Sequence, residues 1–325
     1  MEGRCAGLCH DGIDEQMTSF GAAPGGPDRR SLLIGLAAAP ALIACGYSGP
    51  SRAEPAHPTM SAALAELSRL ETGYAGRIGV YGLDTGSGAE LGYRAQERFA
   101  MCSTFKMLAV AAILQRHRSD SGLLDRLVRY DRSSVIANSP VAAEHVAEGL
   151  TVSALCEAAI TYSDNTAANE LLRILGGPGA VTAFARTLGD GVTRLDRWEP
   201  EMSMVPPGDQ RDTSTPAMMA VDLRALTLAN ALDPARRDQL TTWLLANTTG
   251  ATRIRAGLPA SWRVGDKTGT GFRTELNDLA IVWPPRRAPL IISIYTVRTD
   301  PTASPDHHVL AAAAAIVARA FTPAS

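Results

Sequence analysis

The chain has 325 residues, of which 46 % are hydrophobic, so it can bury a substantial core in one or two domains. Its 31 lysine and arginine residues nearly balance 33 aspartate and glutamate residues, which gives a net charge of −2 and an isoelectric point near 6.3. The chain lacks the basic excess typical of nucleic-acid-binding proteins, and we expect no nucleic-acid partner.

The first 58 residues have the features of an export segment. Arg29-Arg30 precedes an apolar run, as in a twin-arginine signal, and the sequence Leu-Ile-Ala-Cys ending at Cys45 resembles a lipoprotein cleavage site. We therefore predict an export signal at 1–45, a flexible tether rich in Gly, Ser, Pro and Ala at 46–58, and an extracytoplasmic location in the cell envelope. A lipid on Cys45 would be the only link to a membrane. The alternative is an ordinary signal peptide that is cut near this cysteine.

The body, residues 59–325, is predicted to be a single domain of the α+β class. In chain order, a helix is expected at 60–72 and a hairpin of two strands at 77–91. Helical patterns then dominate from about 101 to 250, at 109–116, 151–160, 165–175, 180–188 and 215–230, with a polar, proline-rich loop at 194–212. Strand patterns return at 263–270, 276–283 and 290–297, before a last helix at 308–321. This order predicts an antiparallel sheet built from both chain ends, flanked by helices, with a mostly helical part between them.

The sequence Met-Cys-Ser-Thr-Phe-Lys-Met-Leu at 101–108 opens a run that is apolar on every side, which predicts a helix buried all round. Ser103 stands at its start, and Lys106 follows one turn later. A buried ammonium beside a serine hydroxyl is an arrangement that can activate a nucleophile. A helix-capping serine with a solvent-reaching lysine is the simpler alternative. Cys102 and a second body cysteine, Cys156, are expected to be free, buried thiols.

The lysine count favours the catalytic interpretation. Lys106 and Lys267 are the only lysines among the 31 basic residues. Lysine, unlike arginine, can have its pKa lowered until it carries a movable proton. Both lysines lie within candidate catalytic motifs.

Three more motifs follow Ser103 along the chain: Ser163-Asp164-Asn165, then Arg197-Trp198-Glu199-Pro200-Glu201, then Lys267-Thr268-Gly269-Thr270-Gly271. Each has a structural alternative, as a helix cap, as solvated loop charge and as a strand edge, respectively. Their joint occurrence in this order is difficult to explain by chance. With these motifs the chain resembles the class A serine β-lactamases over residues 60–321.

The resemblance implies a β-lactamase/transpeptidase-like fold and hydrolysis of the β-lactam amide of penicillins and related antibiotics. Ser103 would form an acyl-enzyme, and the N–H groups of Ser103 and Thr270 would form the oxyanion hole. Ser163 would pass a proton to the lactam nitrogen with the help of Lys106 and Lys267. Glu199 would activate the deacylating water, while the base for acylation is either Glu199 or Lys106.

The resemblance also assigns residues around this centre. Substrate would be bound by Asn165, Thr268, Gly269, Thr270, Arg253 and, at the gate of the cleft, Asn138. Arg197 and Asp212 would clasp an Ω loop at 194–212, with a cis peptide bond before Pro200. Two departures stand out: Ser203 replaces the asparagine with which many relatives help Glu199 to hold water, and Leu276 replaces a substrate-binding arginine, whose role would pass to Arg253.

Other functions remain open at this level. A penicillin-binding D,D-peptidase shares the serine and lysine apparatus but lacks the glutamate of the Ω loop, and a non-catalytic β-lactam sensor or cell-wall-binding lipoprotein would not need all these residues. A zinc hydrolase is poorly supported, because the six histidines form no H-x-H or H-E-x-x-H motif. We expect a monomer that needs no metal or other cofactor.

Overall fold

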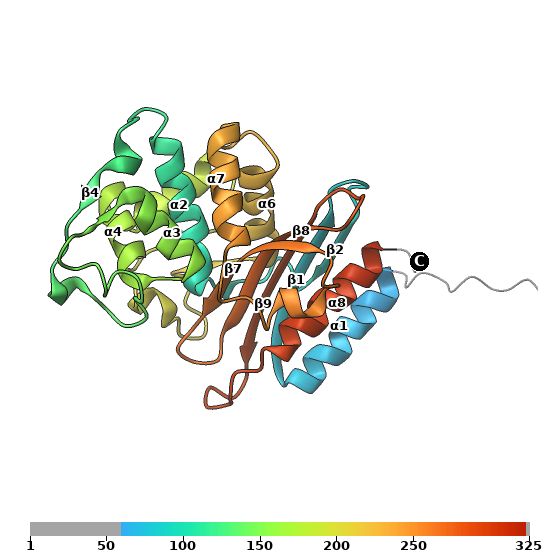
Figure 1. Cartoon of the computed structure of the whole chain (residues 1–325). Coiled ribbons are helices and arrows are strands. Elements are labelled where there is room, and N and C mark those ends of the chain that lie inside the picture. Colours follow the sequence, from blue (N-terminus) through green and yellow to red (C-terminus); the bar gives the residue numbers. More distant parts are fainter. Residues whose placement is uncertain (1–59, 323–325) are drawn as a thin grey trace, which may run out of the picture. The chain divides into compact units, whose positions relative to one another are not determined.

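The computed structural model describes residues 60–322 (Figure 1). The predicted export signal at 1–45 and the predicted tether at 46–58 lie outside the described residues. Among the helices of residues 60–322, none is both long enough and apolar enough to span a bilayer.

A five-stranded antiparallel sheet combines the two ends of the body (Figure 1). Its strands, in spatial order, are β2 (Glu90–Tyr93), β1 (Gly76–Asp84), β9 (Leu290–Arg298), β8 (Leu276–Trp283) and β7 (Arg263–Thr270). The N-terminal β1 pairs with the C-terminal β9 along its whole length, from Gly76 opposite Arg298 to Asp84 opposite Leu290. The predicted α+β class and the sheet built from both chain ends are confirmed.

Helices cover both faces of this sheet, and the strands alternate between two hydrophobic clusters. On β9, Ile292 and Ile294 pack with the helices α1 (Met60–Tyr74) and α8 (His308–Phe321), which lie side by side on one face (Figure 1). Ile291 and Tyr295 belong to the other cluster, under the remaining helices. Because both faces are buried, these strands consist of nearly continuous apolar residues.

The remaining helices lie between β2 and β7 in the chain. They are α2 (Phe105–Arg116), α3 (Val152–Thr161), α4 (Asn165–Leu175), α5 (Gly179–Thr187), α6 (Pro216–Thr227) and α7 (Pro234–Leu245). The helix α7 was not predicted from the sequence, because its early turns are polar. Its buried residues are Leu240, Trp243 and Leu244. The sequence analysis also missed two pairs of two-residue strands, which are too short to show a pattern: β3 (Phe99–Ala100) with β6 (Thr213–Ser214), and β4 (Leu127–Val128) with β5 (Leu150–Thr151).

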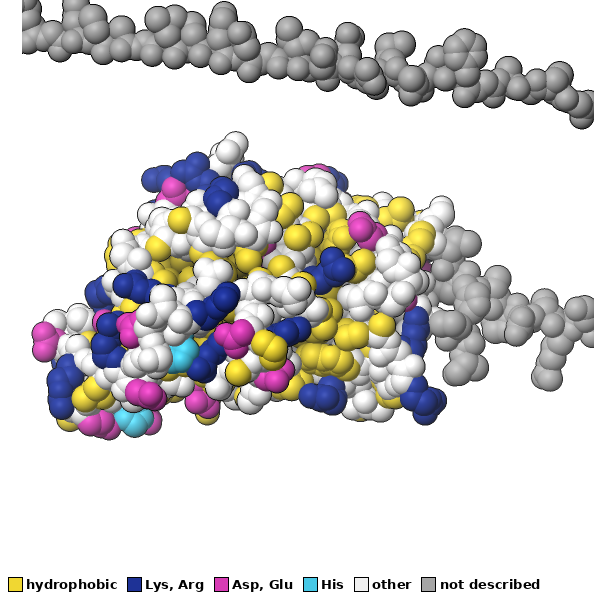
Figure 2. Space-filling view, turned by 90° about the horizontal axis from the view of Figure 1, so that it is seen from above, with side chains coloured by type: hydrophobic (Ala, Val, Ile, Leu, Met, Phe, Trp, Pro, Cys, Tyr) yellow, Lys and Arg dark blue, Asp and Glu magenta, His cyan; other side chains and the backbone are white. Residues whose placement is uncertain are grey.

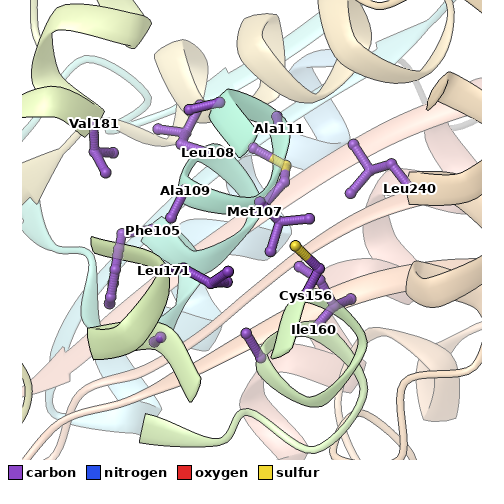
Figure 3. Close-up of a cluster of buried hydrophobic side chains, with 14 of the residues drawn as sticks. Phe105, Met107, Leu108, Ala109, Ala111, Cys156, Ile160, Leu171, Val181 and Leu240 are labelled. Atoms are coloured by element: carbon purple, nitrogen blue, oxygen red, sulfur yellow. The ribbon is translucent and has the colours of Figure 1, made fainter. Parts of the chain in front are cut away.

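The helix α2 is buried on every side, as its sequence predicts. Every residue from Phe105 to Leu114 is buried. Figure 3 shows side chains of α2 among those of the neighbouring helices, such as Ile160, Leu171 and Leu240. Burial of each large apolar side chain here contributes about 1.5–3 kcal/mol, so α2 is a firm base for the residues that precede it.

One detail of the prediction is wrong: Ser103 does not open the α-helix. It lies in a 3₁₀ turn, Cys102–Thr104, and α2 begins at Phe105. Cys102 has a φ angle of 46°, which a right-handed helix cannot contain. Cys102 and Cys156 are both buried free thiols, as expected.

The surface carries charges of both signs. On the face shown in Figure 2, basic and acidic side chains are interspersed, with hydrophobic side chains between them. This distribution agrees with the near-zero net charge of the chain.

Candidate active site

Ser103 lies where the start of α2 meets the sheet strand β7. Ser103 is only 7 % exposed, and it lines a cavity of about 380 Å³. The 3₁₀ turn is fixed by Thr104, whose Oγ1 donates to the carbonyl oxygen of Met101 at 2.8 Å. On β7, a Cβ atom at Gly269 would lie 2.8 Å from the same carbonyl oxygen, so glycine is required for this close approach.

Ser103, Lys106 and Glu199 meet at the floor of the cavity. The Ser103 Oγ donates to Glu199 Oε1 at 3.3 Å, and the Lys106 Nζ lies 3.3 Å from the same oxygen. The side chains of Lys106 and Glu199 are 0 % and 2 % exposed, so their interaction is shielded from water. The Ser103 hydroxyl thus contacts a carboxylate that can accept its proton, and the Lys106 ammonium contacts the same carboxylate oxygen.

Lys106 is also held by the Ser163 motif. Its Nζ donates to the Ser163 carbonyl oxygen at 2.7 Å and to Asn165 Oδ1 at 2.6 Å. Burial lowers the pKa of Lys106, because a charged ammonium loses its hydration there; the carboxylate of Glu199 opposes this effect. Lys106 therefore combines a fixed position with a proton that is less tightly bound than that of an exposed lysine.

Lys267 reaches Ser163 from the opposite side. Its Nζ donates to Ser163 Oγ at 3.0 Å and to the Thr268 carbonyl oxygen at 2.9 Å. Burial, followed by the neighbouring charge of Lys106, lowers the pKa of Lys267 well below its ordinary value. The hydroxyl of Ser163 thus links the two lysines of the chain.

The Ser163-Asp164-Asn165 motif also has its structural role. Asp164 caps α4, since its Oδ1 accepts from the Ala167 N–H at 2.8 Å, and its Oδ2 accepts from Val141 and Ala142. Capping by the middle residue fixes Ser163 and Asn165 on either side of it. The structural interpretation is confirmed for Asp164, and the catalytic roles of Ser163 and Asn165 stay predictions.

Glu199 is positioned by a residue that the sequence analysis missed, Asn169. The Asn169 side chain donates to the Glu199 carbonyl oxygen at 2.9 Å and accepts from the Glu199 N–H at 3.1 Å. The signal was present, because Asn165 and Asn169 are four apart on one face of α4. The peptide bond between Glu199 and Pro200 is cis, as expected from the resemblance.

The two ends of the Ω loop are joined as predicted. Arg197 Nε donates to Asp212 Oδ2 at 2.5 Å, and Asp212 Oδ1 accepts from the N–H groups of Asp196 and Arg197 at 2.7 and 3.0 Å. Asp212 is fully buried, so its charge is compensated only by these donors. The clasp fixes the loop that carries Glu199.

Ser203 lies next to Glu199 on the same loop. Its Oγ donates to Glu199 Oε2 at 3.2 Å. Ser203 and Ser103 thus contact the two different oxygens of one carboxylate. Further out, the Phe272 N–H donates to the Ser203 carbonyl oxygen at 3.3 Å, which ties the loop to the turn after β7.

Arg253 and the threonines of β7 form the opposite end of the cavity. The Arg253 guanidinium donates to the carbonyl oxygens of Gly269 and Asn277 at 2.7 and 2.6 Å and to Thr270 Oγ1 at 2.7 Å. The Thr268 hydroxyl lies 2.5 Å from that of Thr249, which the sequence analysis did not single out. The Arg253 guanidinium is buried and lines the cavity, so this end of the cavity suits an anionic group of a ligand.

The other predicted substrate-binding residues except Gly269 also line the cavity, but their roles stay predictions. Asn138 is there, with its Nδ2 donating to the Ser163 carbonyl oxygen at 3.2 Å, and so are Thr270 and Asn165. Tyr162 and Phe272, 44 % and 62 % exposed, add an aromatic rim that sequence reasoning missed. Within residues 60–322 there is no group of three or more histidine, cysteine or acidic residues that could hold a metal.

Comparisons with known proteins agree with this geometry. The model of the beta-lactamase enzyme family matches residues 62–321. Beta-lactamase FAR-1 of Nocardia farcinica is 52 % identical over 80 % of this chain and 83 % of its own length, and the carbapenem-hydrolyzing beta-lactamase KPC of Klebsiella oxytoca is 48 % identical over 76 % and 85 %. A class A beta-lactamase structure from Mycobacterium abscessus superimposes with a TM-score of 0.78 and 52 % identity, over 80 % of this chain and 98 % of its own. The chain therefore belongs to the class A serine β-lactamase family, whose members are hydrolases that open β-lactam antibiotics and cause resistance to them.

Proposed function

We propose that the chain opens β-lactams through an acyl-enzyme on Ser103. The Ser103 oxygen attacks the carbonyl carbon of the ring, and its proton passes to Glu199, whose Oε1 is 3.3 Å away, or to a neutral Lys106, whose Nζ lies 3.3 Å from the same Oε1. The N–H groups of Ser103 and Thr270 stabilise the oxyanion. Ser163, which accepts from Lys267 at 3.0 Å, gives a proton to the lactam nitrogen as the C–N bond breaks.

Glu199 then frees the serine. It removes a proton from a water molecule, which attacks the ester carbonyl and releases the opened antibiotic. The single observation that carries this proposal is the shared position of Ser103 and Lys106 at 3.3 Å from one oxygen of Glu199. The second oxygen, beside Ser203, remains available to orient the water.

Rapid mixing with a chromogenic cephalosporin tests the proposal. Wild type should turn over continuously, Ser103→Ala should release no product above the uncatalysed rate, and Glu199→Gln should form acyl-enzyme that hydrolyses at least a hundredfold more slowly than in wild type. A wild-type burst of one equivalent without further turnover would instead indicate a penicillin-binding D,D-peptidase. Substantial turnover by Ser103→Ala would exclude the acyl-enzyme route.

We also propose that the protein is exported and anchored in the cell envelope through Cys45. The support is the sequence alone: the twin arginine, the apolar run and the lipobox-like end at Cys45. Fractionation of cells that express the full chain should find the protein with membranes, and Cys45→Ala should release it to the soluble extracytoplasmic fraction. Retention of Cys45→Ala on membranes would contradict a lipid at this position.

We further propose that the enzyme acts as a monomer without metal or cofactor. The catalytic steps above need only side chains of one chain. Activity should survive extensive dialysis against EDTA, and the protein should sediment as one chain at micromolar concentration. Loss of activity that zinc restores would contradict the proposal.

A further inference from the structure

A second cavity of about 430 Å³ is lined in part by the Ω loop. It shares no lining residue with the cavity around Ser103. One wall is the later part of the Ω loop, 205–210, and the opposite wall contains the end of β9, 297–299. Residues 98–100, at β3, and the turn after β7 also line the cavity.

Four arginines line this second cavity: Arg77, Arg98, Arg273 and Arg298. Within residues 60–322, two of them have no carboxylate within ion-pair distance. Arg98 donates only to neutral oxygens, Thr213 Oγ1 at 2.9 Å and the Val192 carbonyl at 3.0 Å, which uses two of its five N–H donors. Arg273 has no hydrogen-bond or ion-pair partner for its side chain among these residues.

The other two arginines are only partly satisfied. Arg77 Nη2 lies 3.0 Å from Glu97 Oε2, on the exposed side. Arg298 Nη2 lies 3.4 Å from Asp306 Oδ2, and its Nε is buried with no hydrogen-bond partner in the described structure. Among residues 60–322, guanidinium N–H groups of Arg98, Arg273 and Arg298 therefore remain without an acceptor.

The two carboxylates that line the cavity do not neutralise these arginines. Asp209 is paired with Arg211, with Arg211 Nη2 at 2.7 Å from Asp209 Oδ2. Glu275 is buried and its Oε2 accepts from the N–H groups of Arg273 and Thr274, both at 3.1 Å. The cavity therefore keeps a positive excess.

We propose that this second cavity binds a phosphate group between Arg98, Arg273 and Arg298. The planar, forked donors of guanidinium groups match the oxygens of phosphate, and arginine is the residue that binds this group most specifically. The group belongs either to free inorganic phosphate or to the headgroup of an anionic lipid. Because one wall is the segment 205–210, a bound phosphate lies against the Ω loop, which carries Glu199, and covers this segment.

Titration of the protein with sodium phosphate, at ionic strength held constant with sodium chloride, tests the proposal. Isothermal calorimetry should show one saturable site, and hydrogen exchange of residues 205–210 should slow on binding. Arg273→Gln and the double variant Arg273→Gln/Arg298→Gln should bind at least tenfold more weakly. Arg273 has no partner to lose, so the single variant should fold normally. Arg118→Gln, which removes an exposed arginine outside either cavity, should bind as wild type does.

A further variant separates this site from the anion-binding end of the active site. Arg253→Gln should retain phosphate binding if the ligand lies in the second cavity. Loss of binding in Arg253→Gln with full binding in Arg273→Gln would overturn the proposal. These measurements do not depend on turnover, so they remain decisive even if the proposed acyl-enzyme mechanism is wrong.

Vesicles distinguish the two sources of the phosphate group. Saturable binding of the free ion identifies a soluble ligand. Co-sedimentation with phosphatidylglycerol vesicles but not with phosphatidylcholine vesicles, without binding of the free ion, identifies a lipid headgroup, provided that Arg273→Gln/Arg298→Gln abolishes it. Absence of both kinds of binding contradicts the proposal.

Discussion

Lysine occurs at two positions in this chain, and both side chains are fully buried on either side of Ser163. Lys106 contacts the carbonyl oxygen of Ser163, and Lys267 contacts its hydroxyl. Burial lowers the pKa values of both lysines. An arginine in either position would keep its proton. Replacement of either lysine by arginine would keep the charge but remove the proton that the mechanism moves.

Arg253 provides a prediction at this scale. Arg253→Ala should raise KM for penicillins about ten- to a hundredfold with a smaller effect on kcat, because it removes a charged hydrogen-bond donor from the end of the cavity that suits a carboxylate. Steady-state kinetics measures both constants. Arg253→Lys, which keeps the charge without the fork, should give an intermediate KM. An unchanged KM in Arg253→Ala would remove this residue from substrate binding.

Ser203 provides a second prediction, about the rate of deacylation. Ser203→Ala should slow deacylation about tenfold, because one hydrogen bond to Glu199 Oε2 is lost beside the proposed water site. Acylation, measured by rapid quench, should change less than twofold. The neighbouring Met204→Ala, at an exposed position, is the control and should leave both steps unchanged. Equal slowing of both steps in Ser203→Ala would indicate a general disturbance of the loop.

At the scale of elements, the site depends on three segments that approach one another closely. The 3₁₀ turn and the first turn of α2 provide Ser103 and Lys106, α4 provides Asn165 and Asn169, and β7 provides Lys267. The Ω loop closes the arrangement through the paired hydrogen bonds of Asn169 with Glu199. Two of these segments are anchored by buried helices, so the loop is the part most sensitive to substitution.

The clasp of this loop can be tested directly. Asp212→Asn should destabilise the fold by about 3 kcal/mol, because it leaves the partly buried Arg197 without its counter-charge. It should also make acyl-enzyme accumulate during turnover, because Glu199 is no longer held in place. Denaturant unfolding and quenched-flow mass spectrometry measure the two effects.

A matched variant controls for charge loss in the same loop. Asp209 forms an ion pair with the exposed Arg211, so Asp209→Asn should change stability by less than about 1 kcal/mol and leave turnover intact. Equal behaviour of the two variants would mean that the clasp has no special role.

At the scale of the whole molecule, the order of elements was readable from the sequence, whereas contacts between distant segments were not. The alternation of strand and helix patterns predicted the sheet from both chain ends, and four motifs predicted the residues around Ser103. The spacing from Asn165 placed Asn169 on the right face of α4, but it was missed because a helix pattern does not reveal a partner, Glu199, that is thirty positions away. The helix α7 was missed because its surface is polar and only three of its residues are buried.

A buried acidic pair should determine how the stability of the whole molecule depends on pH. Asp222 on α6 and Asp190 are both fully buried. In the described structure, both Asp222 oxygens and Asp190 Oδ2 lack a hydrogen-bond donor. A proton on one of the two acids provides such a donor. Burial, together with the charge of Asp190, raises the pKa of Asp222 to about 9. In the unfolded chain this pKa is about 3.9. The stability that the protonated Asp222 provides is thus complete below pH 4 and is lost as the pH rises towards 9.

Asp222→Asn should therefore be more stable than wild type at alkaline pH, since the amide keeps the shape and donates a hydrogen bond to Asp190. We expect its Tm to exceed that of wild type by on the order of 5 °C at pH 9, with the difference shrinking towards pH 5. Calorimetry across this range measures the effect, with the exposed Asp238→Asn as control. A difference that does not vary with pH would contradict the assignment of a proton to Asp222.

The most direct measurement is the intact mass of the protein during reaction with benzylpenicillin, followed by mapping of any adduct to a peptide. The account predicts that Glu199→Gln gains the mass of one whole penicillin on the peptide that contains Ser103, whereas Glu199→Gln/Ser103→Ala gains none. An adduct on another residue, or rapid turnover by Glu199→Gln with no adduct, would contradict it.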